Sequence, residues 1–202
     1  MGLTEIPGSG QQGLPDKEDL LIPSIATSHE LNELEQLNIQ QAIRWTIQRR
    51  RKFTPTEVLT ERFIKDLHRR MFGLVWKNAG HFKDSGKEGE PDKYLIGREL
   101  RLLLDDIRYW IGNQTYTEDM IAVRFQHRLG SIRCFANGNA RHSRLMGDLL
   151  IEKIFGKQPF SWGGATIGAD NIRMENPRAV YTASLQEADA GKFEPLLQFA
   201  RS

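Results

Sequence analysis

The chain has 202 residues, of which 39% are hydrophobic and 27% charged, a composition typical of a globular domain with enough apolar material for a core. Its 28 Lys and Arg residues nearly balance 26 Asp and Glu residues, and the net charge of +2 argues against a nucleic-acid coat or a polybasic membrane binder. The single cysteine, Cys134, excludes an internal disulfide, and no apolar run reaches the ~18 residues of a membrane span. We therefore expect a cytoplasmic, single-domain protein without membrane contact.

Residues 1–24 are rich in Gly, Pro, Gln and acidic side chains, and they predict an irregular N-terminal tail. A helix over residues 29–51 is expected next. Thr27 and Glu30 have the Thr-x-x-Glu spacing of a capping box, and the basic run at 49–52 suits a helix C-terminus.

Thr54 and Pro55 predict another helix start. Apolar residues then recur every four positions, at Leu59, Phe63, Leu67 and Met71. A clean amphipathic stripe covers residues 100–111. Between these two helices, residues 82–97 lack helical period, and we expect them to form a short β-hairpin flap.

The helix predicted over residues 117–132 is apolar nearly all round, which is typical of a central, buried helix. Further helices are predicted over 138–155, 177–188 and 193–201. The expected fold is therefore an all-α bundle around the central helix, with the flap as its irregular part.

Residues 132–144 form a polar, glycine-containing loop that leads from the central helix into the next helix start. Free backbone amides and the helix dipole at such a start attract anions, phosphates above all. Arg141 and Arg144 are three residues apart, so they project from one helix face and can share a polyphosphate. An ordinary helix start with solvated arginines is the alternative.

This loop resembles the signature of the Fic family, His-Pro-Phe-x-(Asp/Glu)-Gly-Asn-Gly-Arg-x-x-Arg, at Phe135, Gly138, Asn139, Arg141 and Arg144. Segments 67–72, 76–82 and 125–129 also look like that family, and residues 36–200 as a whole resemble its mobile mystery protein B subgroup. The resemblance implies a Fic-type helical domain over residues 25–202.

The family resemblance implies a protein adenylyltransferase that transfers AMP from ATP, with Mg²⁺, to a hydroxyl of a target protein. In that scheme the motif histidine is the general base, the acidic motif residue holds Mg²⁺, and the Gly-Asn-Gly amides bind phosphates. The nucleotide-binding residues implied here are Asn137, Gly138, Asn139, Ala140, Arg141 and Arg144. The flap over 82–97 is expected to dock the target backbone as an added strand, through Lys93, Tyr94, Leu95 and Ile96.

Three positions depart from the signature. Arg133 stands where the family has its histidine, and a guanidinium has no nitrogen that can accept a proton. Loss of a general base typically lowers the rate by about 10²–10⁴. Ala140 replaces the second motif glycine, which costs space or backbone freedom unless the residue simply begins a helix. Asn137 replaces the acidic residue and would be a weak ligand for Mg²⁺. We therefore expect a weak or inactive transferase, either a natural paralogue or a laboratory variant.

Glu35 falls within an apolar stripe of the helix predicted over 29–51, formed by Leu31, Leu34, Ala42 and Trp45. A carboxylate on a buried face needs a cation as partner. Residues 31–36 are similar to the inhibitory Ser/Thr-x-x-x-Glu-Gly/Asn segment of many Fic proteins, although the Ser/Thr and Gly/Asn positions differ. The resemblance implies that Glu35 pairs with Arg144 and blocks the γ-phosphate site of ATP; otherwise Glu35 lies at the stripe's edge and pairs with a surface arginine.

Two functions stay open at this point. The first is an autoinhibited Fic-type adenylyltransferase whose partners are ATP, an unknown target protein and, as in toxin–antitoxin pairs, a small protein encoded nearby. The second is a catalytically silent module that binds a nucleotide or a protein through the same loop. Near-balanced charge argues against nucleic acid as a partner. A nucleophilic Cys134, with His142 or His127 as its base, would lack an orienting third group.

Overall fold

The computed structural model describes residues 19–47, 52–83, 93–164 and 176–202. Within these residues the structure is helical and contains no strand, which confirms the all-α class. The elements are α1 (Ser28–Thr46), α2 (Pro55–Val58), α3 (Glu61–Phe72), α4 (Lys93–Asn113), α5 (Glu118–Ile132), α6 (Asn139–Leu149), the π-helical turn η2 (Leu150–Ile154), α7 (Pro177–Asp189) and α8 (Glu194–Arg201).

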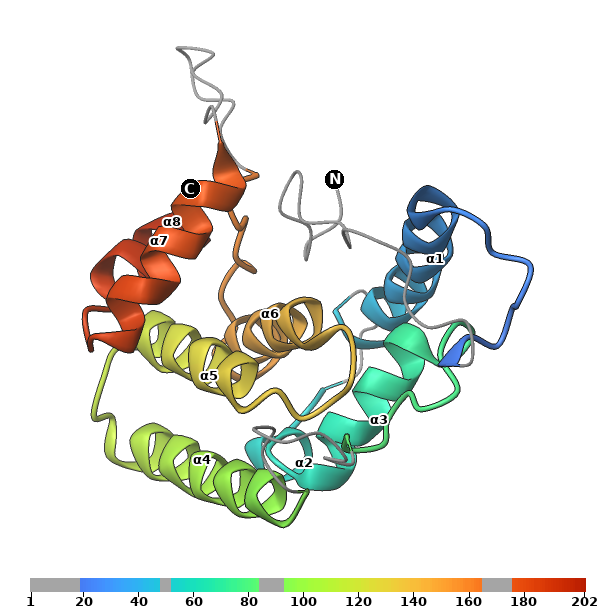
Figure 1. The fold of residues 1–202 in the computed structure, drawn as a ribbon. Helices are drawn as coiled ribbons and strands as arrows, with labels where there is room; N and C mark the ends of the chain where they lie inside the picture. Colours follow the sequence, from blue (N-terminus) through green and yellow to red (C-terminus); the bar gives the residue numbers. More distant parts are fainter. Residues whose placement is uncertain (1–18, 48–51, 84–92, 165–175) are drawn as a thin grey trace.

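The helices are arranged around α5 and α6, which pack against each other in the middle of the molecule (Figure 1). On one side lie α1 and α3, which also pack together, and on the other side lies the pair α7 and α8. Helix α4 packs on the outer side of α5, at the bottom of Figure 1. None of the described helices is both long enough and apolar enough to cross a membrane.

The capping box predicted for the first helix is present. The backbone N–H of Glu30 donates to the Thr27 hydroxyl oxygen at 3.2 Å, and the N–H of Thr27 donates to the Glu30 carboxylate at 3.2 Å. The helix ends at Thr46, earlier than residue 51, and residues 48–51 lie outside the described residues. Local capping chemistry therefore located the start of this helix better than its end.

The four-residue repeat that begins at Leu59 does not belong to one helix. Helix α2 ends at Val58, and the backbone of Leu59 leaves the helical region (φ −86°, ψ 56°). The hydroxyl of Thr60 then accepts from the N–H of Phe63 at 3.2 Å and caps α3. A second capping residue inside the apolar repeat thus divides the segment into two helices.

The flap prediction is wrong for residues 93–97, which are helical. Lys93, Tyr94, Leu95 and Ile96 form the first turn of α4, so their backbone is helical and cannot add a strand to a target. Ile96 is buried and begins the apolar stripe that Leu100 continues one turn later. The helix period therefore extends further towards the N-terminus than the sequence suggested. Residues 84–92 of the predicted flap lie outside the described residues.

The predicted N-terminal tail also lies mostly outside the description, which begins at residue 19. Its last part is irregular, as expected, but it is not loose. The N–H of Leu21 donates to the carbonyl of Val75 at 2.9 Å, and Leu20, fully buried, bridges to Trp76. This short segment covers the apolar turn that follows α3.

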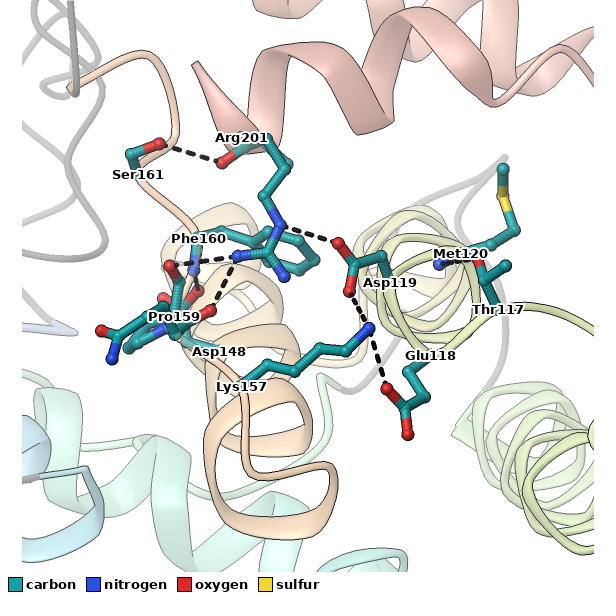
Figure 2. Close-up of polar contacts among 12 residues, drawn as sticks. Thr117, Glu118, Asp119, Met120, Asp148, Lys157, Pro159, Phe160, Ser161 and Arg201 are labelled. Atoms are coloured by element: carbon teal, nitrogen blue, oxygen red, sulfur yellow. Dashed lines mark hydrogen bonds and ion pairs between the residues drawn. The ribbon is translucent and has the colours of Figure 1, made fainter.

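The C-terminus closes the bundle through Arg201. Figure 2 shows its guanidinium between the first turn of α5 and the segment that follows η2. Its Nε donates to Asp119 at 2.8 Å, and its Nη1 donates to the carbonyl of Gln158 at 2.7 Å. Lys157 adds ion pairs to Asp119 (3.1 Å) and Glu118 (2.8 Å). These contacts hold α8 against α5 and so fix the wall of the molecule that α7 and α8 form.

Candidate functional site

The loop between α5 and α6 has two residues with left-handed backbone angles. Arg133, which ends α5, has φ 51° and ψ 55°, an uncommon conformation for a residue with a side chain. Gly138, the N-cap of α6, has φ 74°. A Cβ atom on Gly138 would lie 2.4 Å from Cζ of Phe72, so both the backbone angle and the space require glycine.

The start of α6 leaves backbone donors free of helix partners. The first intrahelical hydrogen bond of this loop region runs from the N–H of His142 to the carbonyl of Gly138 at 2.9 Å. The amides of residues 139–141 therefore have no acceptor inside the helix, as in every α-helix start. Together with the helix dipole they are suited to the anion binding that the sequence predicted, which stays a prediction.

Asn139 and His68 brace this loop from inside. The Asn139 side chain accepts from the N–H of Phe135 at 3.0 Å and donates to the carbonyl of the same residue at 2.7 Å. His68 accepts from the N–H of Gly80 with Nδ1 (3.0 Å), so its Nε2 carries the proton and donates to the carbonyl of Asn137 (3.0 Å). Burial lowers the pKa of His68 to about 4, which keeps the ring neutral at physiological pH. The loop shape thus depends on its own side chains and on α3.

A cavity of about 580 Å³ opens beside this loop. Five of the predicted site residues line it, namely Arg133, Asn137, Gly138, Asn139 and Ala140. Ala140 lies within α6 and does not have a positive φ, so its methyl group causes no backbone strain and its effect is confined to the space it takes in the cavity. The structure therefore brings the centre of the predicted motif together around one cavity.

The other cavity residues were not predicted to bind the nucleotide, although Phe135 belongs to the signature and His127 was considered as a base for Cys134. They are Lys83, Gln126, His127, Gly130, Ser131, Phe135, Ala136, Ser143, Tyr181, Leu185 and Asp189. Polar side chains on an otherwise apolar α5 were a usable signal for Gln126 and His127. Nothing in the sequence indicated Tyr181 or Asp189, because they come from α7, far along the chain.

Two polar contacts connect α7 to this cavity. Nε2 of His127 lies 2.8 Å from Oδ1 of Asp189, so a cavity residue of α5 is bonded to the last residue of α7. The amide of Gln126 donates to the hydroxyl of Tyr181 at 2.9 Å and lies 3.3 Å from the Ser143 hydroxyl. These bonds fix the side of the cavity opposite α3.

Glu35 is fully buried and reaches this region from α1. Its Oε1 accepts from the indole N–H of Trp76 at 2.6 Å, and its Oε2 accepts from Nη2 of Arg141 at 2.6 Å. The interpretation of Glu35 as a buried, paired carboxylate is therefore confirmed, but the expected partner was wrong: the ion pair is made with Arg141, not Arg144. The reason is the direction of the two arginines on α6.

The two arginines of α6 diverge. Arg141 points towards α1 and α3, where its guanidinium lies 5.2 Å from the ring centre of Phe72. Arg144 is buried and points towards α7, where its guanidinium lies 5.3 Å from the ring centre of Tyr181. Neither Arg141 nor Arg144 is among the described residues that line the cavity. Sharing of one polyphosphate by both would need these side chains to move.

The donor set for a metal ion is weak. Among the described residues, no three His, Cys, Asp or Glu side chains gather where they could hold a metal. The loop itself offers Asn137, a neutral amide, where a carboxylate would bind Mg²⁺ more tightly. Such residues fit a Mg²⁺ that is held mainly by the phosphates of a bound nucleotide.

Cys134 is unsuited to nucleophilic chemistry. Its side chain is buried, and burial raises the pKa of the thiol to about 12. The thiolate is the reactive form of cysteine, so almost none would be present at neutral pH. His142, one of its two candidate bases, donates from Nε2 to the carbonyl of Ile64 at 3.1 Å and is itself buried.

Comparisons with known proteins give a fold. A scan against protein-family models and a search of curated proteins found no significant match. Among solved structures, the chain is similar to the N-terminal Fic domain of Bep8 from Bartonella sp. 1-1C, with a TM-score of 0.63 at 13% identity over 89% of this chain and 88% of that one. This chain has a Fic fold.

Two further structures agree. BepC from Bartonella tribocorum, solved with bound AMPPNP, has a TM-score of 0.61 at 15% identity over 88% of this chain and 87% of that one. A Fic-1 fragment from C. elegans has a TM-score of 0.62 at 20% identity over 90% of this chain. The chain spans 50% of the length of that fragment. The Fic-type bundle expected from the loop at 132–144 is thus confirmed as a fold.

Proposed function

We propose that this chain is a member of the Fic family, in its mobile mystery protein B subgroup, and that it binds ATP at the loop over residues 132–144. It is a protein adenylyltransferase scaffold, held inactive by α1 and further weakened by Arg133 and Ala140. The observation that carries this proposal is the cavity of about 580 Å³ at the start of α6.

Phosphate chemistry supports the nucleotide as ligand. The cavity meets the free amides of the α6 start, where partial positive charge favours a phosphate chain. Arg133 and Lys83 line the same cavity and add two cations. A volume of this size lies within the range of small-molecule sites. BepC, which shares the fold, was solved with a nucleotide analogue bound.

The proposed transfer forms a bond between a target hydroxyl oxygen and the α-phosphorus of ATP and releases pyrophosphate. The hydroxyl proton needs an acceptor, and Arg133 has none because its guanidinium stays protonated. Arg133 can attract the phosphates, however. We therefore infer that this chain binds ATP but transfers AMP slowly. Its turnover rate should be about 10²–10⁴-fold lower than that of a variant with histidine at position 133.

Autoinhibition is proposed through Glu35. The ion pair with Arg141 keeps this guanidinium on the α1 side of α6, away from the cavity. An ATP molecule whose β- and γ-phosphates need Arg141 must compete with a fully buried carboxylate for it. Removal of the carboxylate should free Arg141 for the nucleotide.

Two measurements test the proposal. Calorimetric titration of Glu35→Gly with Mg²⁺-ATP should show tighter binding than the parent chain. Incubation of Arg133→His/Ala140→Gly/Glu35→Gly with labelled ATP should give protein-linked AMP, which the parent chain gives weakly or not at all. Arg62→His, an exposed arginine of α3 outside the cavity, is the matched control and should leave both results unchanged. Absence of ATP binding in all variants would refute the proposal.

The alternative is a catalytically silent module that binds a nucleotide through the same loop. The lack of an acceptor on Arg133 is the observation that favours it. The same variants distinguish the two functions. A silent module would bind ATP after Glu35→Gly but would give no protein-linked AMP even with histidine at position 133 and glycine at position 140.

A further inference from the structure

Helix α4 exposes large apolar side chains on its outer face. Its inner stripe, which includes Leu100 and Ile107, is buried against the bundle. On the opposite face Leu95, Leu102 and Tyr109 remain 47%, 51% and 62% exposed. They are seven residues apart, so they follow one line along the helix for about 21 Å. Figure 1 shows this helix at the edge of the molecule, with no described element on its outer side.

Two charges flank this line, about 40° to either side of Leu102. Arg98 precedes Leu102 by one turn and Asp106 follows it by one turn, and both are exposed. Among the described residues neither has an ion-pair partner, whereas the neighbouring Asp105 is paired with Arg108 at 2.6 Å. We call the five residues Leu95, Arg98, Leu102, Asp106 and Tyr109 the α4 stripe.

The α4 stripe is self-complementary about its midpoint. Consider a second copy of α4 that runs antiparallel to the first, with its Leu102 against Leu102 of the first. A residue that precedes Leu102 in one copy then lies at the level of the residue that follows Leu102 by the same number of positions in the other copy. Arg98 then lies at the same height along the interface as the partner's Asp106, and Leu95 lies at the same height as the partner's Tyr109. The two-fold axis repeats each contact, as an isologous interface requires.

We infer that the α4 stripe is a docking surface for a second copy of this chain. An unrelated partner would not need opposite charges at equal distances from a central leucine, but a two-fold dimer does. Where helices pair along their length, charged residues that flank the apolar contact line set partner choice and orientation, and Arg98 and Asp106 occupy such flanking positions. None of the α4 residues lines the cavity at the start of α6, so dimerisation leaves that site open and does not depend on its proposed function.

The dimer should be weak. One helix face of this length buries less than the ~1,200–2,000 Å² of a stable interface, so we expect a dissociation constant above about 1 µM. Sedimentation velocity of the full chain from micromolar to millimolar concentration should show a concentration-dependent shift from monomer to dimer.

Charge reversal gives the decisive variants. Arg98→Asp and Asp106→Arg should each weaken the dimer by about tenfold or more, because one substitution alters both symmetry-related pairs. The double variant Arg98→Asp/Asp106→Arg restores opposite charges and should dimerise like the parent chain. Leu102→Glu places two like charges on the axis and should give a monomer. Arg101→Asp is the control, since it makes the same charge change on the same helix but lies about 100° away from Leu102.

Circular dichroism and thermal unfolding of each variant establish that the fold is kept. A parent chain that stays monomeric at millimolar concentration would overturn the inference, and would indicate that another segment or protein covers the stripe. A dimer that Arg98→Asp does not weaken, or one that the double variant fails to restore, would overturn it as well.

Discussion

The ion pair between Glu35 and Arg141 allows a sharp prediction about stability. Glu35→Gln keeps an oxygen that can accept from the Trp76 indole, but it places an amide N–H₂ against the guanidinium of Arg141 in place of a carboxylate. The variant thus removes the charge without emptying the space. It tests whether α1 is held to α6 by electrostatics and not only by packing.

The magnitude follows from the burial of the two side chains. Breaking a buried pair by removing one partner costs about 3–5 kcal/mol, because the remaining charge is left without compensation. The Glu35 side chain is 0% exposed, but that of Arg141 is 15% exposed and can be partly solvated. We therefore expect a loss of about 2–3 kcal/mol, which for a chain of this size lowers Tm by about 5–10 °C.

Thermal unfolding without nucleotide, followed by circular dichroism, measures this loss. The double variant Glu35→Gln/Arg141→Met is the matched control: it removes the uncompensated cation and should recover most of the lost Tm, since replacement of a whole buried pair is often nearly neutral. An unchanged or higher Tm for Glu35→Gln alone would refute the reasoning. So would a double variant that is less stable than Glu35→Gln.

Three further predictions concern the loop and its supports. Since burial lowers the pKa of His68 from 6.5 to about 4, only the unfolded chain binds this proton between those values. His68 should therefore lower the free energy of unfolding by about 2 kcal/mol from pH 7 to pH 5, in addition to a fall of the same sign from His142, whose pKa burial also lowers. Urea titrations of His68→Gln should show a flatter pH dependence than those of the parent chain. Gly138→Ala should lower the free energy of unfolding, measured in the same assay, by about 2–5 kcal/mol, because position 138 has a positive φ and the new methyl group would overlap Phe72. Gly156 has a similar φ but open space around it, so Gly156→Ala should lower this free energy by only about 1 kcal/mol. The Cys134 thiol should react with a thiol reagent at an appreciable rate only after unfolding, because it is buried and its pKa is raised to about 12; rapid reaction of the native chain would contradict this.

The helix starts could be predicted well from the sequence because their chemistry is local. Thr27, Thr54 and Thr117 each accept from a backbone N–H three residues ahead, as their side chains and spacing indicate. Thr60 does the same, but it lies inside an apolar repeat that reads as one continuous helix. Periodicity and capping gave conflicting signals there, and capping determined the backbone.

The central position of α6 could not be predicted in the same way. The sequence favoured α5 as the buried helix, since it is apolar nearly all round, yet α6 buries charged side chains that look like surface residues. Asp148, for example, is fully buried and accepts from the indole N–H of Trp162 at 3.0 Å and from the N–H of Phe160 at 3.2 Å. Burial raises the pKa of this carboxyl well above its ordinary value. Its partners lie 12 and 14 residues further along the chain, outside α6, so the pattern of α6 alone could not indicate that burial.

The candidate site shows the same division between local and distant information. Loop residues such as Gly138 could be predicted because a tight turn before a helix requires them. The cavity wall from α7, with Tyr181 and Asp189, could not, because no local pattern links α7 to α5. The partner of Glu35 was also beyond reach: spacing places Arg141 and Arg144 on one face, but the packing of α1 and α7 on opposite sides of α6 separates their side chains.

These positions also show how binding and turnover can be separated in this fold. Glu35 acts on Arg141 from α1, so it would control where a phosphate-binding cation points. Arg133 ends α5 with left-handed backbone angles and lines the cavity, so it would control whether a bound nucleotide meets a proton acceptor. Glu35 joins α1 to Trp76 and Arg141 through polar contacts, so its loss costs stability as estimated above, whereas Arg133 lies in the loop after α5. The proposed loss of catalysis at Arg133 therefore does not imply loss of nucleotide binding, and under the proposed autoinhibition α1 would regulate that binding even in a chain with little turnover.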